Sequence, residues 1–220
     1  MSNVQKQNEM IQEEIIKALK KRYAVKTFDK DKKVSDENLK TILESGRLTP
    51  SSIGLEPWKF IVVENKELRE KLRAVSHDQT KVTDASHIIV ITYRTDAKQL
   101  VSELIERTAK SRNQNMEELA PLQKRYEGMM ENMSEEAQKT WIKSQAYIPL
   151  GIMTETASLL DIDNCPMEGF DGAEVDKILN LAEKNLSVAT ILAIGYRGDD
   201  PYAKLAKVRR DYDDVVEIIK

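Results

Sequence analysis

The 220-residue sequence predicts an α+β fold, an α/β sandwich in which helices flank a sheet. Three runs rich in valine and isoleucine recur along the chain, and segments with helical spacing of apolar residues separate them. Each run is nearly continuously apolar, which is typical of strands that are covered on both faces. Hydrophobic residues make up 40% of the chain, and a chain of this length can bury a sizeable core.

The predicted strands are "KFIVVE" (59–64), "HIIVITY" (87–93) and "LSVATILAIGY" (186–196). All three are rich in β-branched residues, which favour extended backbone. The tail "DVVEIIK" (214–220) has a similar composition and could form one more strand. Such an apolar edge favours aggregation unless it pairs with another sheet.

Two amphipathic helices are predicted before the first strand. Residues 4–22 carry apolar side chains at helical spacing. Ser35 is a typical N-cap residue for the second helix, which should end near Gly46.

A polar helical region covers residues 97–147, with a predicted break at Pro121 and a restart at Ser134. It leads into "WIKSQAYIPLGIMTETASLLDI" (141–162), which we expect to be the central helix because it is the most apolar. Pro149 lies inside that segment. An interior proline loses a backbone hydrogen bond at a cost of about 3 kcal/mol, so a kink or a break is expected there.

The composition excludes several classes of protein. A formal net charge of −3 and a pI near 5.6 argue against general nucleic-acid binding, which usually requires a basic excess. No apolar run approaches the length of a membrane span, and the first 22 residues lack the apolar core of a secretion signal. We therefore expect a cytoplasmic protein with no nucleic-acid or membrane partner.

The single cysteine, Cys165, cannot form an internal disulfide or a thiolate zinc cage. Its acidic neighbours Asp161, Asp163 and Glu168 would disfavour a thiolate, so a small apolar residue near the end of a short strand is a better interpretation than a nucleophile. The two histidines are not spaced as a metal pair, and no metal is expected. Phosphate-binding glycine motifs are also absent from the sequence.

Two basic segments are candidates for anion binding. "KKRYAVKTFD" contains Arg22 and Lys26, and "KLAKVRRDY" contains Lys207 and Arg209 two residues apart. In an extended segment that spacing directs both side chains to one side, where they could bind a phosphate. Taken alone, such charges are more often solvated surface groups, and Lys81 by itself is equally uninformative.

The segment "TPSSIGLEPWKF" (49–60) is a third candidate, because its hydroxyls and backbone N–H groups could contact a phosphate or a ring edge. The alternative is an ordinary loop in which Trp58 fills part of the core. The residues themselves do not decide between these two interpretations.

Taken in order along the whole chain, these segments resemble the nitroreductase family of FMN-dependent NAD(P)H oxidoreductases. The resemblance is carried by "KRYAVKTFD", "TPSSIGLEPWKFIVV", Lys81 ahead of "DASHIIV", "WIKSQAY", "PMEGFD" and "KVRRDYDDVV". It implies one nitroreductase-like domain over 1–220, with a central mixed sheet wrapped by helices. It also implies a homodimer with one FMN at each end of the interface, in which the C-terminal strand is a candidate for exchange between the chains.

The resemblance also implies a set of cofactor-binding residues. Arg22 and Lys26 would approach the ribityl and pyrimidine side of the flavin. Lys207 and Arg209 would bind its phosphate, and Lys81 would face the polar ring edge that gains negative charge on reduction. The remaining residues of the implied site are Tyr23, Ala24, Pro50, Ser51, Ser52, Gly54, Asp78, Pro166, Met167, Glu168 and Gly169.

Two segments have particular roles in this implied site. Pro50, Ser51 and Ser52 would come from the other chain and close over the ring. Glu168 and Gly169 would lie behind the flavin, with a backbone N–H directed at N5, the atom that exchanges hydride.

The sequence departs from the common family pattern at four places. Ala24 replaces a usual serine, the aromatic Tyr23 replaces a usual polar residue, and Ile53-Gly54 follows the serines where asparagine is common. Asp78 replaces an asparagine, so its carboxylate either points away from the flavin or lowers the flavin potential. These changes bear on substrate scope more than on FMN binding.

The implied mechanism is ping-pong. NADH or NADPH passes hydride to flavin N5, and an acceptor such as a nitroaromatic, a quinone or a flavin then uses the same place, so no catalytic side chain is required. Two alternatives stay open. One is an FMN-holding or flavin-remodelling protein with little NAD(P)H turnover, and the other is a helical interaction protein that uses the polar residues 97–135.

Overall fold

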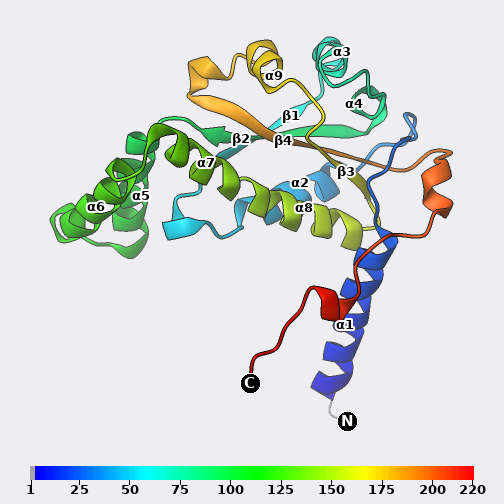
Figure 1. The fold of residues 1–220 in the computed structure, drawn as a ribbon, viewed down its shortest axis with the longest axis horizontal. Coiled ribbons are helices and arrows are strands. Elements are labelled where there is room, and N and C mark those ends of the chain that lie inside the picture. The colour runs from blue at the N-terminus through cyan, green and yellow to red at the C-terminus, as the bar shows by residue number, and fades with distance from the viewer. Residues whose placement is uncertain (1–2) are drawn as a thin grey trace.

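The computed structural model describes residues 3–220, and its centre is a four-stranded sheet with helices on both faces (Figure 1). The strands lie in the order β1-β2-β4-β3, and every neighbouring pair in the sheet is antiparallel. A parallel bridge joins Ala24 to Asn164 and adds the N-terminal segment beside β3. The predicted α+β sandwich is confirmed, and parallel pairing is limited to that bridge within residues 3–220. The strands are β1 Trp58–Val63, β2 His87–Arg94, β3 Asp163–Met167 and β4 Leu186–Gly195.

The helices form two covering layers (Figure 1). α3, α4 and α9 lie over one face of the sheet, while α2, α7 and α8 lie over the other and α5 and α6 extend that second layer to one side. Short 3-10 turns η1 Ser52–Gly54, η2 Ala182–Lys184, η3 Pro201–Lys204 and η4 Tyr212–Asp214 complete the chain. The helices are α1 Asn3–Lys21, α2 Asp36–Arg47, α3 Lys66–Ala74, α4 Lys81–Asp84, α5 Ala97–Arg112, α6 Met116–Glu131, α7 Glu135–Gln145, α8 Tyr147–Leu159 and α9 Gly172–Ile178.

The two layers explain why β2 and β4 are continuously apolar. Successive side chains of a strand point to opposite faces. Ile89 and Ile91 therefore enter one hydrophobic cluster, under α2, α5 and α8, while Ile88 and Val90 enter the other, under α3, α4 and α9. Because both faces are covered, most positions on both faces are apolar, and the buried hydroxyl of Thr190 in β4 donates to the carbonyl of Met167 at 2.9 Å.

The predicted burial of both faces is wrong for β1. Its apolar run is typical of a strand covered on both faces, but most of its side chains are only half-buried. The reason is its place in the sheet: β1 is an edge strand that pairs with β2 alone. Runs of apolar residues do not distinguish an edge strand from a central one.

The helix α2 begins as predicted. The side chain of Ser35 accepts a hydrogen bond from the backbone N–H of Asn38. Gly46 lies one residue before the end of α2, where an added Cβ would come within 2.8 Å of the sulfur of Met153. The helix ends at Arg47, near Gly46 as predicted, and this glycine also lets α2 pack closely against α8.

The two prolines of the helical region behave differently from each other. The predicted break at Pro121 is wrong: Pro121 lies inside α6, and the chain breaks instead around Asn113, which is left-handed and caps α5. The break expected near Pro149 is confirmed, because α7 ends at Gln145 and α8 starts at Tyr147. Pro149 is the third residue of α8, where its missing N–H leaves no helical bond unmade.

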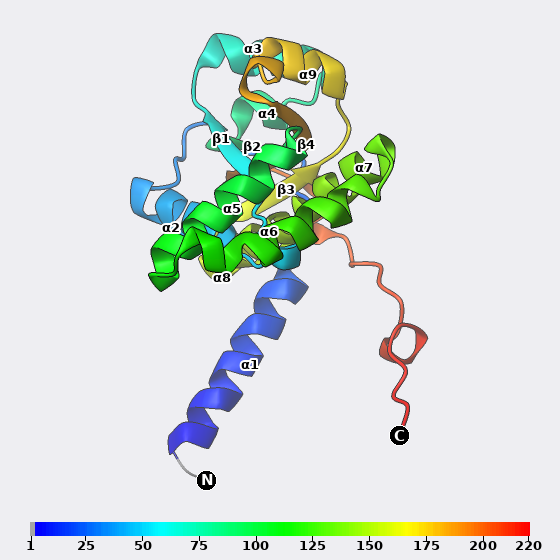
Figure 2. The ribbon, with the colours of Figure 1, turned by 90° about the vertical axis from the view of Figure 1, so that its left-hand side faces the viewer.

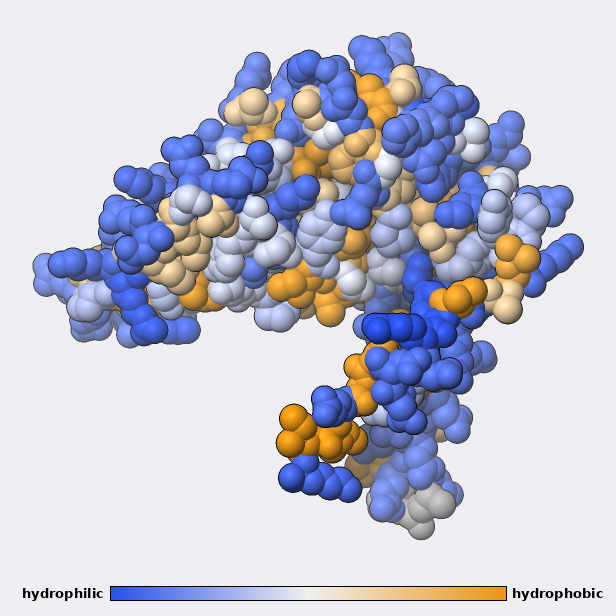
Figure 3. Space-filling view, viewed as in Figure 1, coloured by the Kyte–Doolittle hydropathy of each residue, from blue (hydrophilic) through white to orange (hydrophobic). Residues whose placement is uncertain are grey.

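The first helix and the C-terminal segment project from the same side of the body (Figures 1 and 2). The tail after η3 forms no strand among the described residues, in contrast to the strand considered for 214–220. Apolar side chains are exposed along it (Figure 3), including Val208, Ile218 and Ile219. No helix within residues 3–220 is long and apolar enough to cross a membrane.

Candidate functional site

The segment that leaves α1 runs beside β3. The backbone N–H of Val25 donates to the carbonyl of Asn164 at 3.3 Å, next to the bridge between Ala24 and Asn164. This pairing places the half-buried guanidinium of Arg22 near the middle of β3, close to Cys165. The first basic segment is thereby fixed to the sheet.

The second basic segment returns to the same place. The ammonium of Lys207 donates to the carbonyl of Leu19 in α1 at 2.5 Å. Burial lowers the pKa of Lys207, and so do the nearby cations Arg209 and Arg22. Burial likewise lowers the pKa of Arg22, with Arg209 as a further cause. Three cations from the two ends of the chain thus form one cluster.

This cluster, Arg22 with Lys207 and Arg209, is not neutralised by the protein. None of the three makes an ion pair with a carboxylate in the described part of the chain. The buried Nε of Arg22 also has no hydrogen-bond partner there. Since like charges repel and buried donors need acceptors, the cluster suits a multiply charged anion such as a phosphate.

The grouping of the basic residues in the structure differs from the predicted one. Arg22 was expected beside the ribityl chain with Lys26, yet it lies with the predicted phosphate residues Lys207 and Arg209. The side chain of Lys26 is exposed, and its backbone N–H is held by the carboxylate of Asp200 at 2.7 Å.

The other end of β3 carries the second group of predicted residues. Pro166 and Met167 complete the strand, and the exposed residues Glu168 and Gly169 follow it. The side-chain amide of Gln79 donates to the carbonyl of Gly169 at 2.9 Å. In the part of the chain that the structure describes, the N–H groups of residues 168 and 169 have no acceptor, so they are free to bind a ligand.

Lys81 begins α4, two residues after Gln79, and its side chain is buried without an ion-pair partner among residues 3–220. The position of α4 is fixed by Arg69, which is itself buried. Its guanidinium donates to the carbonyls of Val82, Ala85 and Ser86 at the end of α4. Sequence reasoning missed this supporting role, because an arginine inside an amphipathic helix normally reads as a surface charge.

The two groups lie at different places along β3. The cluster of three cations lies where the N-terminal segment pairs with Asn164, and the free N–H groups, with Lys81 close by in sequence to Gln79, lie beyond Met167 where the strand ends. From Asn164 to Met167 a strand rises about 10 Å. An elongated ligand with a phosphate at one end and a polar ring at the other fits this arrangement.

Asp78 does not join this site. Its carboxylate pairs with the guanidinium of Arg73 at 2.8 Å, and its side chain is 80% exposed. Of the two interpretations of this residue, the geometry favours the one in which the carboxylate points away. Its backbone has φ of 52°, a left-handed conformation that asparagine and aspartate tolerate better than most residues.

The serine loop lies in a different part of the chain. The N–H of Ser52 donates to the side chain of Gln145 at 2.8 Å, and the hydroxyl of Ser51 accepts from the N–H of Glu56. Gly54 faces Leu104 of α5. Ser52 and Gly54 therefore lie against α7 and α5, and Pro50 beside them is exposed, so one chain does not bring this loop to β3. Their placement over the flavin of a partner chain stays a prediction.

Cys165 lies in the middle of β3 rather than at its end, and its side chain is 1% exposed. It belongs to the hydrophobic cluster under α3, α4 and α9. Burial of this kind withholds the thiol from any substrate in solution, as the interpretation of a small apolar residue predicts.

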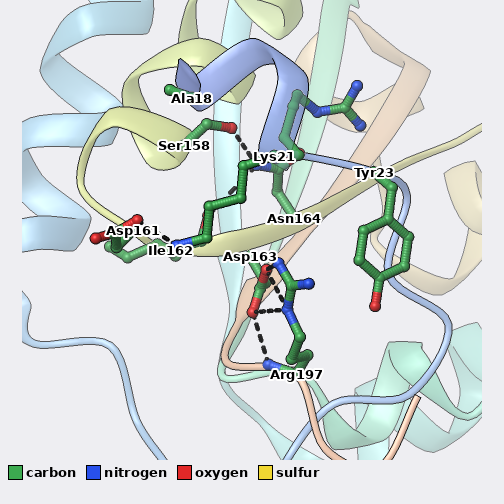
Figure 4. Close-up of a pocket in the computed structure, with 10 residues that line it drawn as sticks. Ala18, Lys21, Tyr23, Ser158, Asp161, Ile162, Asp163, Asn164 and Arg197 are labelled. Carbon is green, nitrogen blue, oxygen red and sulfur yellow. Dashed lines mark hydrogen bonds and ion pairs between the residues drawn. The ribbon is translucent and has the colours of Figure 1, made fainter. Parts of the chain in front are cut away.

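Figure 4 shows a small pocket behind the N-terminal segment. Lys21 pairs there with Asp161 at 2.6 Å, and Arg197 pairs with Asp163. Arg22 also lines this pocket. Because Lys21 and Arg197 are already paired, Arg22 is the lining cation that has no ion-pair partner in the described chain. Sequence reasoning missed the Arg197 pair and also Asp200, although Asp-Pro at 200–201 is a typical start of a helical turn.

Comparison with known proteins identifies the family. Residues 19–196 match the sequence model of the nitroreductase family. A Staphylococcus epidermidis protein named as a candidate NAD(P)H nitroreductase is 39% identical over 216 residues, which is 94% of this chain and 97% of that protein. A Staphylococcus saprophyticus protein with the same kind of name is 36% identical over 219 residues, covering 94% of this chain and 97% of its own.

Solved structures show the same fold. A candidate nitroreductase of Bacillus subtilis superposes with a TM-score of 0.84 at 22% identity, over 94% of this chain and 100% of that one. A candidate nitroreductase of Exiguobacterium sibiricum in complex with FMN gives 0.80 at 21% identity, over 93% and 97%. The sandwich and its sheet order thus define a protein with the nitroreductase fold. The chain belongs to the nitroreductase family, and it is an enzyme of that family.

Proposed function

We propose that the chain is an FMN-dependent NAD(P)H oxidoreductase that binds FMN along β3. The observation that carries the proposal is the cluster of Arg22, Lys207 and Arg209, three cations with no carboxylate partner in the described chain. The FMN in the Exiguobacterium relative and the NAD(P)H in the names of the Staphylococcus relatives support the choice of cofactor and reductant.

The residues present fit such a group. The three cations would hold the phosphate, and Lys81 would place a positive charge at the polar edge of the ring. The free N–H groups of Glu168 and Gly169 would donate to the ring from behind. FMN, when bound, supplies the hydride acceptor and donor, and the protein contributes binding, orientation and electrostatics.

Glu168 has a second contact that shapes this end of the site. Its carboxylate accepts a hydrogen bond of 2.5 Å from the hydroxyl of Tyr147, which also donates to the carbonyl of Ala189 at 3.1 Å. Burial raises the pKa of Tyr147, as does the bond to Glu168, so the hydroxyl stays protonated at neutral pH. The bond turns the Glu168 side chain toward α8 and leaves its backbone N–H for the ligand.

The proposal includes a ping-pong reaction with nitroaromatics, quinones or related small acceptors. It also includes one domain over 1–220, a homodimer in which each site takes the serine loop of the partner, and a cytoplasmic location. Support for the homodimer comes from the distance within one chain between that loop and β3, and from the exposed apolar tail.

Anaerobic bleaching tests the proposal. The purified protein should be yellow, and NADH or NADPH should bleach its flavin absorbance within seconds in the absence of oxygen. A colourless protein that binds no FMN contradicts the proposal outright. A yellow protein that neither reductant bleaches indicates instead the alternative of a protein that holds or remodels FMN.

A further inference from the structure

Asp200 is a buried carboxylate, 4% exposed, in the segment that follows β4. Its Oδ2 accepts hydrogen bonds from the hydroxyl of Tyr23 at 2.9 Å, from the N–H of Lys26 at 2.7 Å and from the N–H of Thr27 at 3.3 Å. Its Oδ1 accepts from the N–H of Tyr202 at 3.0 Å. One carboxylate thus joins the segment after α1 to the segment after β4.

Each of the joined segments carries cations of the proposed phosphate site. Arg22 stands directly before the N-terminal residues that Asp200 binds, and Lys207 and Arg209 follow Asp200 along the chain. The far end of the second segment is tied by the bond from Lys207 to the carbonyl of Leu19. Residues 201–206, which lie between Asp200 and Lys207, are exposed. Asp200 is therefore the buried residue that holds the start of the basic segment in place.

The charges favour an ionised carboxylate. Burial acts to raise the pKa of Asp200, but hydrogen bonds from Lys26, Tyr202, Tyr23 and Thr27 outweigh it and lower the pKa. Burial and the bond to Asp200 raise the pKa of Tyr23 to about 12, so its hydroxyl remains a donor at neutral pH.

Arg197 contacts Tyr23, one of the residues that Asp200 binds, and links it to β3. Its guanidinium lies over the ring of Tyr23, 4.8 Å from the ring centre, and it pairs with Asp163 at the start of β3 (Figure 4). The N–H of Arg197 also donates to Asp163 at 2.9 Å. Because its charge is already paired, Arg197 supports Tyr23 and is not a fourth ligand of the anion.

We infer that Asp200 is a positioning residue for phosphate binding, which fixes Arg22 relative to Lys207 and Arg209. This inference rests on the proposed function. Four donors converge on the carboxylate, and an asparagine would offer an NH₂ group in place of one acceptor oxygen, so it cannot satisfy all of them. Asp199 provides the matched control, because it is the adjacent residue, carries the same charge and is exposed.

The test compares FMN with riboflavin, the same ring system without the phosphate. The full-length protein, freed of flavin, is titrated with each by flavin fluorescence. Asp200→Asn should weaken FMN binding about tenfold and change riboflavin binding less than about twofold, since a misplaced cation cluster costs only the phosphate contacts. Asp199→Asn should alter neither affinity.

The outcomes separate this inference from the proposed function. An equal loss for both flavins in Asp200→Asn gives Asp200 a purely structural role and overturns the inference, as does no loss at all. A wild-type protein that binds FMN no better than riboflavin overturns the phosphate site, and the inference with it.

If Asp200→Asn does not fold, the variant Tyr23→Phe tests the positioning role of Asp200 instead. It removes one of the four donors, and it should reduce the ratio of FMN to riboflavin affinity about threefold, with thermal unfolding close to wild type. An unchanged ratio in Tyr23→Phe overturns the positioning role.

Discussion

Lys207 and Arg209 extend from an exposed segment, yet the structure folds them back onto Arg22 beside α1. Arg209→Ala or Lys207→Ala should weaken FMN retention about tenfold to a hundredfold, because each loses a charge-assisted bond of about 1.5–3 kcal/mol. Flavin occupancy after dilution and dialysis measures the effect. The rate of flavin reduction per bound FMN should change less than the occupancy does.

A control for these variants is Arg210→Ala, which removes an exposed cation next to Arg209 in the sequence. It should retain FMN as the wild type does. Full occupancy in both cluster variants after dialysis would show that the phosphate lies elsewhere.

The cluster also predicts a pH dependence. The pKa of Lys207 lies below the ordinary value of 10.5 because of burial, Arg209 and Arg22. A bound phosphate stabilises the charged ammonium and raises that pKa, so FMN affinity should be highest at pH values below the depressed pKa and should fall as pH rises through it. FMN titrations at increasing pH measure this fall, which should begin below pH 10.5.

Lys207→Arg is the diagnostic variant for this dependence, because arginine stays charged over the whole range. It should keep FMN affinity flat where the wild type declines. The same decline in both proteins would assign the titration to another group.

Cys165 and Gly169 should respond oppositely to substitution. Cys165→Ala removes a buried sulfur from the core at a cost of about 1 kcal/mol and should keep FMN and most activity. Gly169→Val should lose FMN or slow hydride transfer, because a Cβ there already comes within 3.3 Å of Gln79 and 3.4 Å of His77. Absorbance spectra and NAD(P)H oxidation rates measure both. Inactivity of Cys165→Ala with flavin fully bound would make the thiol catalytic.

At the scale of helices, the contrast between two prolines is testable. Pro121 is exposed and lies inside α6, beyond its first turn, whereas Pro149 lies in the first turn of α8. Pro121→Ala should raise the free energy of unfolding by about 1–3 kcal/mol, because it restores a helical hydrogen bond and removes a clash. Thermal unfolding at a fixed protein concentration measures the change.

Pro149→Ala is the comparison for that experiment. Its N–H would have no helical acceptor to gain, so no increase in stability is expected. A rise in unfolding temperature for Pro149→Ala equal to that for Pro121→Ala would contradict this explanation of the two positions.

At the scale of the molecule, we predict an obligate homodimer. Val208, Ile218 and Ile219 are 88%, 71% and 89% exposed in the single chain, and α1 projects from the body with Met10 and Ile16 exposed. Burying such side chains against a partner is favourable by about 25 cal/mol per Å² of apolar surface. Light scattering should give about twice the chain mass of 25.1 kDa.

Ile218→Asp combined with Ile219→Asp should weaken the dimer and release FMN together, since the serine loop is proposed to close the partner's site. Glu217→Gln, in the same tail, should do neither. A monomer that retains FMN at low micromolar concentration would contradict the homodimer.

Much of the fold could be predicted from local patterns. Runs of valine and isoleucine located β2 and β4, Ser35 located the start of α2, and the ordered motifs indicated the family. The half-burial of β1 could not be predicted locally, because it depends on the place of the strand at the sheet edge. The break after α5 does have a local cause, the left-handed Asn113, and the prediction was wrong because it gave the break to Pro121 instead.

The sequence by itself determined the α+β class, the order of the elements and the residue types of the site, because these depend on periodicity and on motifs within short stretches. Only the tertiary structure decided which cations converge. Arg22 and Lys207 lie far apart in the chain, and their proximity depends on the pairing of the N-terminal segment with β3 and on the four hydrogen bonds of Asp200. Such contacts are set by packing between distant segments, and no local pattern records them.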